Sequence, residues 1–167
     1  MSDVPSQVGA PGPVGCLSAT QATLEAVSAI EHPLCLMCSP ANPLGMKLAF
    51  RVQDDGSVSA VLPCRDALQS YPETLHGGVI SALLDAAMTN ALFSVGLVGV
   101  TAELTVRFLA PVSLGRDAVV RASIDRPTAH RLCYVRSEFE QDQRILARAS
   151  AKFAIKRGVS TFEATRE

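Results

Sequence analysis

The chain has 167 residues, of which 48% are hydrophobic and 19% charged. This length and composition can bury one sizeable core, so we predict a single folded domain and exclude disorder over the whole length. Fifteen Lys and Arg oppose sixteen Asp and Glu, giving a formal charge of -1. No global basic field draws the chain onto a phosphate backbone, so we expect no nucleic-acid partner.

The five cysteines are an odd number, and the chain begins without the basic, apolar and small-residue pattern of a secretion signal. We therefore expect reduced thiols and a cytoplasmic protein. The apolar stretch 79–100 is interrupted by Asp85 and other polar residues. It therefore predicts a buried helix and no membrane span.

Residues 1–15 are rich in Pro and Gly, which predicts a mobile leader. Ser18 then stands where an N-cap would, ahead of apolar residues at helical spacing, and His32-Pro33 ends the pattern. These signals predict a short amphipathic helix over 18–31. We expect this helix to cover an edge of a sheet.

Strand-like alternation begins at Met46, and an Asp-Asp-Gly turn separates it from a second alternating run. This pattern predicts a hairpin of residues 46–52 and 58–62. Further strands are predicted after the central apolar segment, over residues 101–109, 118–124, 132–140 and 145–155. Consecutive strands joined by turns predict an antiparallel meander.

The central segment, residues 76–93, is rich in Ala and Leu and apolar almost all round. Such a segment is typical of a helix buried on most faces, so a sheet must wrap around it. The predicted fold is α+β, with one long central helix enclosed by a curved antiparallel sheet of about six strands. The leader is thus followed by one domain over residues 16–158 and a C-terminal tail over 159–167.

A polar stripe crosses the predicted central helix, because Ser81, Asp85 and Thr89 are spaced four apart. A buried carboxylate without partners is costly, so Asp85 is either paired, by capping a loop or meeting an arginine, or working chemically. Gly77 and Gly78 begin the helix, where a ligand meets free N–H groups and the positive end of the helix dipole. An oxyanion held there, beside a carboxylate, is the minimum for acyl-transfer hydrolysis.

Two stretches together resemble a known family. The run Leu75-His76-Gly77-Gly78 with Leu84-Asp85, and the later stretch 101–115 with Arg107-Phe108, resemble the signature of hotdog-fold acyl-CoA thioesterases of the phenylacetate-pathway and 4-hydroxybenzoyl-CoA thioesterase type. The resemblance covers about residues 46–156. It implies the hotdog fold and a homodimer, expected to form a dimer of dimers, with active sites at the subunit interface.

The resemblance also implies residue roles. Asp85 would be the base or nucleophile, and the backbone N–H of Gly77 or Gly78 would polarise the thioester carbonyl. Thr101 would orient the hydrolytic water, and His76 would fix the loop or touch the thioester from the partner chain. The implied reaction is hydrolysis of an acyl-CoA to free acid and CoA, with no metal or other cofactor.

One departure concerns the position six residues before His76. Many members carry Asn or Gln there, whereas this chain has Ser70, with Gln69 beside it. Either would substitute by hydrogen bonding.

A cleft lined by Leu, Met and Phe suits a medium-chain or aromatic acyl group. The residues expected to bind substrate are Asn42, Met88, Thr89, Arg107 and Arg131.

Cys35-Leu36-Met37-Cys38 has the spacing of half a zinc knuckle, and His32 lies just before it. Because no second Cys pair follows, we expect buried or loop thiols here and no metal site.

Two other functions remain open on the same fold. One is a non-catalytic acyl-CoA-binding sensor module; the other is a dehydratase or hydratase, whose required His and acid are not found in the sequence.

Overall fold

The computed structural model describes residues 18–127 and 132–157; the predicted leader, Arg131 and the predicted C-terminal tail lie outside the described residues. The helices are α1 (Gln21–Glu31), the short 3-10 helix η1 (Asp66–Leu68) and α2 (Gly77–Ser94). The strands are β1 (Arg51–Val52), β2 (Val58–Pro63), β3 (Val98–Phe108), β4 (Asp117–Pro127), β5 (Leu132–Gln141) and β6 (Arg144–Arg157).

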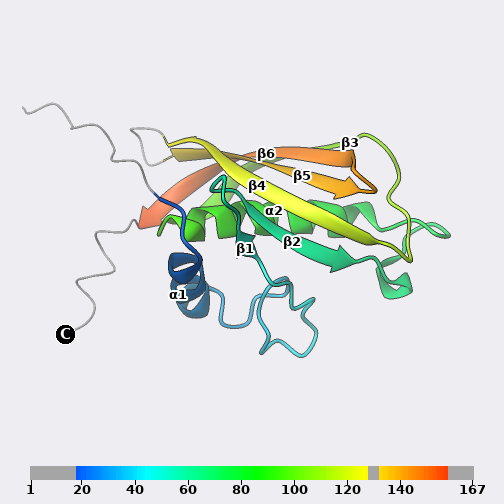
Figure 1. The fold of residues 1–167 in the computed structure, drawn as a ribbon, viewed down its shortest axis with the longest axis horizontal. Helices are drawn as coiled ribbons and strands as arrows, with labels where there is room; N and C mark the ends of the chain where they lie inside the picture. The colour runs from blue at the N-terminus through cyan, green and yellow to red at the C-terminus, as the bar shows by residue number, and fades with distance from the viewer. Residues whose placement is uncertain (1–17, 128–131, 158–167) are drawn as a thin grey trace, which may run out of the picture.

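The strands form one six-stranded antiparallel sheet in the order β1-β2-β4-β5-β6-β3, which curves over α2 (Figure 1). The predicted α+β architecture of a long central helix and six strands is confirmed. α2 is buried on most faces because the sheet covers one side and α1 packs against another. Its Leu83, Leu84 and Met88 side chains are fully buried, and each such burial contributes about 1.5–3 kcal/mol.

α2 is also long and apolar enough to cross a membrane, by length and composition alone. However, 61% of that stretch is buried inside the protein. The core position of α2 therefore accounts for its composition.

The predicted meander is correct for β4, β5 and β6 and wrong for β3, which pairs with β6 at the far edge. Hydrogen bonds along the β3–β4 connection show why. The N–H groups of Leu109 and Ala110 donate to Leu146 O near the start of β6, at 2.8 and 3.2 Å, and Leu75 N–H donates to Val112 O at 2.9 Å. The connection thus runs across the end of the sheet, which the spacing of strands in the sequence cannot reveal.

α1 begins three residues later than predicted, at Gln21, and its N-cap is Thr20, not Ser18. The Thr20 side chain accepts the Thr23 N–H at 3.1 Å, and the Thr20 N–H donates to Ser94 O at 2.9 Å. This second bond fixes the start of α1 against the end of α2, a long-range contact that favours Thr20 over Ser18. The helix ends at Glu31, as predicted.

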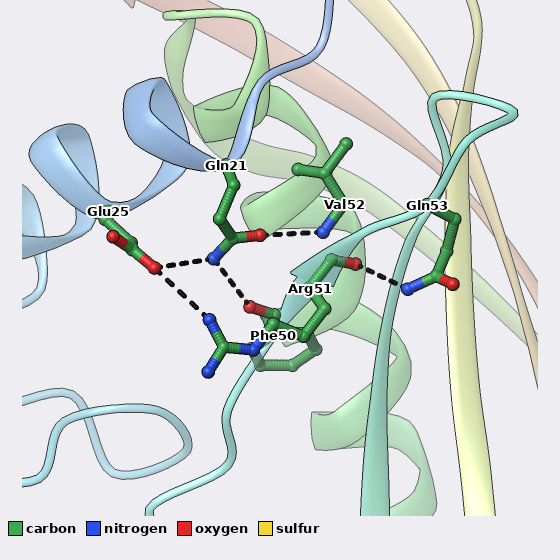
Figure 2. A network of polar contacts seen from close by, with 6 residues as sticks. All are labelled: Gln21, Glu25, Phe50, Arg51, Val52 and Gln53. Carbon is green, nitrogen blue, oxygen red and sulfur yellow. Dashed lines mark hydrogen bonds and ion pairs between the residues drawn. The ribbon is translucent and has the colours of Figure 1, made fainter.

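The prediction that α1 covers a sheet edge is confirmed, because the Gln21 side chain binds the backbone beside edge strand β1 (Figure 2). Its Oε1 accepts the Val52 N–H at 2.9 Å, and its Nε2 donates to Phe50 O at 3.3 Å. Nε2 also donates to Glu25 Oε1, which pairs with Arg51 at 3.3 Å. Two of the backbone polar groups that a sheet edge usually leaves open are therefore occupied by the same chain.

The first strand of the predicted hairpin is much shorter than expected, since β1 contains only Arg51 and Val52. The preceding residues bind the loop after α1: Met46 N–H donates to Leu36 O at 2.8 Å, and Leu48 N–H donates to Met37 O at 2.9 Å. Lys47 has a φ of 55°, which interrupts an extended strand. The alternation of apolar residues there reflects burial of Leu48 and Phe50 without a strand partner.

Candidate functional site

Asp85, the carboxylate on α2, is bound by a side chain of the neighbouring strand β3. Thr101 Oγ1 donates to Asp85 Oδ1 at 2.6 Å. No ion pair involves Asp85 among residues 18–127 and 132–157. The interpretation of Asp85 as an arginine partner is therefore excluded for this part of the chain, and Asp85 and Thr101 are brought together as predicted.

The other two members of the polar stripe are satisfied within α2 itself. Ser81 Oγ donates to Gly77 O at 3.0 Å, and Thr89 Oγ1 donates to Asp85 O at 3.1 Å. Such bonds to the carbonyl four residues earlier are common for helical Ser and Thr. Of the stripe, Asp85 is thus the side chain that reaches another element.

A β-bulge at Ala102 aims Thr101 at the helix. Thr101 lies opposite Phe153 in the sheet, whereas Glu103 lies opposite Lys152, so Ala102 is an extra residue. Phe153 is fully buried, so Thr101, its cross-strand partner, shares the sheet face toward α2. Glu103 points to the outer face, where it pairs with Lys152. Bulges re-aim side chains in this way next to active sites.

The start of α2 leaves one of the two predicted glycine donors available. His76 is the N-cap, and its Nδ1 accepts the Gly78 N–H at 2.8 Å. A Cβ on Gly78 would lie 3.0 Å from the His76 ring, so glycine allows this close cap. Of the two alternatives that the sequence left open, the Gly78 N–H is therefore already occupied. Gly77, the first helical residue, has an N–H without an acceptor inside the helix.

An apolar surface lies beside this helix start. After the bulge, Leu104, Val106 and Phe108 face the α2 side, opposite the buried or nearly buried Ala151, Ala149 and Ala147. We call these three side chains the β3 apolar row. Leu104 is 37% and Phe108 53% exposed, and a Cβ on Gly77 would lie 3.5 Å from the Phe108 ring. The stretch from Gly77 to Asp85 therefore adjoins exposed apolar side chains.

Ser70 and Gln69, the predicted substitutes for an amide, hold the loop before α2. Ser70 N–H donates to Thr74 O at 2.9 Å, and Gln69 Oε1 accepts the Glu73 N–H at 3.1 Å. Ser70 is exposed, and neither side chain is hydrogen-bonded to Asp85 within the described residues. Their predicted catalytic contribution stays a prediction.

The predicted substrate-binding residues that the structure describes differ in their surroundings, and their binding role stays a prediction. The Asn42 side chain is used by its own loop, donating to Leu34 O and accepting the Leu44 N–H, each at 2.9 Å. Met88 is fully buried in the core. Arg107 lies opposite Arg148 on the outer face, because the bulge changes which β3 residues face α2.

Thr89 remains adjacent to Asp85 through its backbone bond. The sequence reasoning missed the β3 apolar row, although Arg107-Phe108 was noticed as a motif.

A separate surface hollow of about 360 Å³ is lined by residues 63–66 and 115–117. Asp85, Gly77 and Thr101 are not among its lining residues.

Burial shifts the pKa values of His32, Cys64 and Cys133. Burial is the main cause that lowers the pKa of His32, opposed by the charges of Glu31 and Asp85. Burial alone raises the pKa of Cys133 to about 11. Burial, together with the nearby charge of Asp117, raises the pKa of Cys64 to about 11. These two cysteines are isolated core residues, as predicted.

Comparisons with known proteins agree with this geometry. Residues 73–147 match the Thioesterase superfamily. A search of curated proteins found no match. One similar crystal structure is that of a thioesterase superfamily protein, with 24% identity and a TM-score of 0.66. The match covers 70% of this chain and 61% of that one, so this chain spans less than two thirds of its length.

Two further solved structures resemble the chain. A putative thioesterase from Ralstonia eutropha JMP134, described as phenylacetic acid degradation-related, has 26% identity and a TM-score of 0.58 over 65% of this chain and 84% of that one. A hypothetical thioesterase from Streptococcus pneumoniae TIGR4, crystallised with coenzyme A, has 18% identity and a TM-score of 0.61 over 66% and 90%. Two single mutants of that streptococcal protein were also crystallised, one with alanine in place of an aspartate and the other with alanine in place of a threonine 16 positions later.

The residues matched by the family model make the chain similar to the thioesterase superfamily, and its helix-in-sheet architecture is that of the hotdog fold. The resemblance to phenylacetate-pathway thioesterases seen in the sequence is thus supported by the family model and by the structure from Ralstonia eutropha.

Proposed function

We propose that the protein is a thioester hydrolase that cleaves an acyl-CoA to a free acid and CoA, with Asp85 as its catalytic carboxylate. The observation that carries the proposal is the 2.6 Å bond from Thr101 to Asp85, two helical turns from the Gly77 N–H. The same two residue types, 16 positions apart, were replaced in the streptococcal thioesterase. Asp85 and Thr101 are also separated by 16 positions.

The chemistry follows from what each group offers. The thioester carbonyl oxygen accepts the Gly77 N–H at the positive end of α2, which stabilises the negative charge formed on attack. Thr101 occupies Oδ1 of Asp85 and orients the carboxylate. Asp85 either removes a proton from a water that attacks the carbonyl carbon or attacks that carbon directly, giving an anhydride that water cleaves. In both routes the C–S bond breaks and CoA leaves as a thiolate.

The acyl group proposed is medium-chain or aromatic. The β3 apolar row adjoins Gly77, so an acyl chain whose carbonyl binds there would lie against Leu104 and Phe108. Apolar lining with a few placed polar groups is typical of ligand sites. Coenzyme A in the similar streptococcal structure supports the CoA part of the substrate. Neither route of hydrolysis, by an activated water or by direct attack of Asp85, requires a metal or other cofactor.

We propose a homodimer joined through β3, with two dimers forming a tetramer, acting in the cytoplasm. β3 is an edge strand of 11 residues with exposed Val100, Leu104 and Phe108. A long apolar edge is a template for pairing with another strand. Antiparallel pairing of two β3 strands about a two-fold axis would place each Asp85 site beside the partner subunit. His76 and Ser70 would then have the partner within reach.

The decisive experiment measures thiol release from a panel of medium-chain and aromatic acyl-CoA esters by the wild type and Asp85→Asn. We expect kcat to fall by about 10²–10⁴-fold, the usual contribution of a positioned acid or base. Ser81→Ala is the matched control, since Ser81 lies on the same stripe but bonds only within α2.

Equal rates for Asp85→Asn and the wild type would refute the role of Asp85. Absence of turnover by the wild type together with tight acyl-CoA binding would favour the alternative function, a non-catalytic acyl-CoA-binding sensor module.

A further inference from the structure

A second cluster of reactive side chains lies where α1 ends. His32 follows the last residue of α1, and Cys35 and Cys38 lie on the next turns. One ligand atom from each of these residues lies within 4.8 Å of the other two, and His32 Nδ1 is 3.6 Å from Cys38 Sγ. The thiols and the imidazole therefore converge on one point, which the sequence spacing alone left open.

The spacing agrees with a tetrahedral zinc centre. With Zn–S of about 2.3 Å and Zn–N of about 2.0–2.1 Å, tetrahedral angles separate S from N by about 3.5 Å and two S atoms by about 3.8 Å. The observed 3.6 Å between His32 Nδ1 and Cys38 Sγ is close to the first value. The upper limit of 4.8 Å for the remaining separations requires at most a small movement of side chains.

We propose that His32, Cys35 and Cys38 bind one Zn²⁺ ion, with water in the fourth position. Two thiolates and one imidazole are soft and intermediate donors, which favour zinc over Mg²⁺ or Ca²⁺. This proposal reverses the expectation from sequence that these thiols are free of metal. It uses none of the residues of the Asp85 site and does not rest on the proposed function.

The His32 ring is held in place before any ion binds. It packs edge-on against Phe93 of α2, with ring centroids 4.8 Å apart and an interplanar angle of 76°. The His32 N–H donates to Ser28 O at 2.9 Å and ends α1. An oriented imidazole loses little freedom when it ligates a metal, which favours binding.

The two cysteines are also presented by an ordered turn. Cys35 N–H donates to His32 O at 3.2 Å, and Ser39 N–H donates to Cys35 O at 3.1 Å. Ser39 Oγ donates to Pro33 O at 2.6 Å. The turn therefore holds both sulfurs on the side where His32 lies.

The side chains of Ser28 in α1 and Asn90 in α2 lie close enough to Cys38 to influence its pKa. Such outer partners stabilise metal-bound thiolates and orient them. A bound ion would thus join α1, the loop after it and α2, fixing the loop that carries Asn42.

The test uses the full chain, reduced and stripped of metal with a chelator. We expect calorimetric titration with Zn²⁺ to give one ion per chain, and substitution with Co²⁺ to give thiolate-to-metal charge-transfer bands. Cys35→Ser and Cys38→Ser should each weaken zinc binding by more than about 100-fold, since even outer-shell changes cost 10–100-fold. Cys133→Ala, which removes a core thiol away from the cluster, should leave affinity and stoichiometry unchanged.

Circular dichroism of each variant separates loss of a ligand from loss of the fold. Unchanged zinc affinity in folded Cys35→Ser and Cys38→Ser would overturn the proposal. So would a wild-type Co²⁺ complex without thiolate bands, a result that does not depend on any variant folding. Absence of zinc binding by the reduced wild type would also overturn it.

Discussion

The two edge strands of the sheet, β1 and β3, differ in length and in how far the rest of the chain covers them. The β1 edge is only two residues long, and the Gln21 side chain of α1 binds the backbone of Phe50 and Val52 there. The β3 edge is 11 residues long, and beyond its pairing with β6 no described element covers it. One edge is thus closed by the chain itself and the other remains available to a second molecule.

This difference indicates that β3 contributes to the Asp85 site in two ways. Its first part supplies Thr101 to Asp85, and its second part supplies the β3 apolar row. The β1 edge carries no side chain of the Asp85 site. We therefore expect changes at the β3 edge to affect assembly and catalysis, and changes at the β1 edge to affect stability alone.

The largest effect is expected from Leu104→Lys. In the proposed dimer this change buries an unpaired charge, which costs about 3–5 kcal/mol and raises the dimer dissociation constant by more than about 100-fold. Light scattering after gel filtration should give a monomer, and thioesterase activity should fall by a similar factor.

Val61→Lys is the matched control, because Val61 is an exposed apolar residue of β2 with 53% exposure, on a strand inside the sheet. It should leave the assembly unchanged. A Leu104→Lys protein that remains dimeric and active would show that β3 is not the interface.

A smaller effect is expected from Thr101→Val, which keeps the shape of the side chain and removes the hydroxyl. A hydrogen bond to a charged group contributes about 1.5–3 kcal/mol, so kcat should fall by about 10–100-fold. Thr105→Val, on the outer face of the same strand, should leave kcat unchanged. A fall in Tm with no change in kcat would assign Thr101 a purely structural role.

The smallest effect is expected at the covered edge. Gln21→Ala removes two bonds to the backbone, so the free energy of unfolding should fall by about 1–2 kcal/mol with kcat unchanged. Urea unfolding measures this change. Glu25→Gln should alter stability by less than about 0.5 kcal/mol, because its ion pair with Arg51 is more than 60% exposed on both sides. An equal effect of the two substitutions would contradict the closing role of Gln21.

The sequence predicted the parts of the fold that local patterns encode. The all-round apolar composition of 76–93 identified α2, and turn residues separated the strands that became β4, β5 and β6. The position of β3 could not be predicted, because strand order depends on the path of the β3–β4 connection across the sheet. The cap at Thr20 depends likewise on the contact of that residue with Ser94.

For the candidate site, too, the sequence predicted residues that local patterns mark and missed features that depend on the fold. Asp85, Gly77 and Thr101 could be proposed because four-residue spacing, a glycine pair and a resemblance mark them. The outward position of Arg107 and the inward position of Leu104 and Phe108 could not be predicted, because they depend on the Ala102 bulge, which has no reliable sequence signal. His76 was expected near the site, yet its capping of Gly78 required coordinates.

The bulge also sets a rule for how this strand can vary over evolution. Ala102 adds one residue between the segment that carries Thr101 and the segment that carries Leu104 and Phe108. A strand of the same length without the bulge would turn one segment inside out relative to the other, so that Glu103 and Arg107 would face α2 in place of Leu104 and Phe108. Deletion of Ala102 would instead keep Thr101 and Leu104 on the face toward α2, so a related strand can be one residue shorter here if it also lacks the bulge.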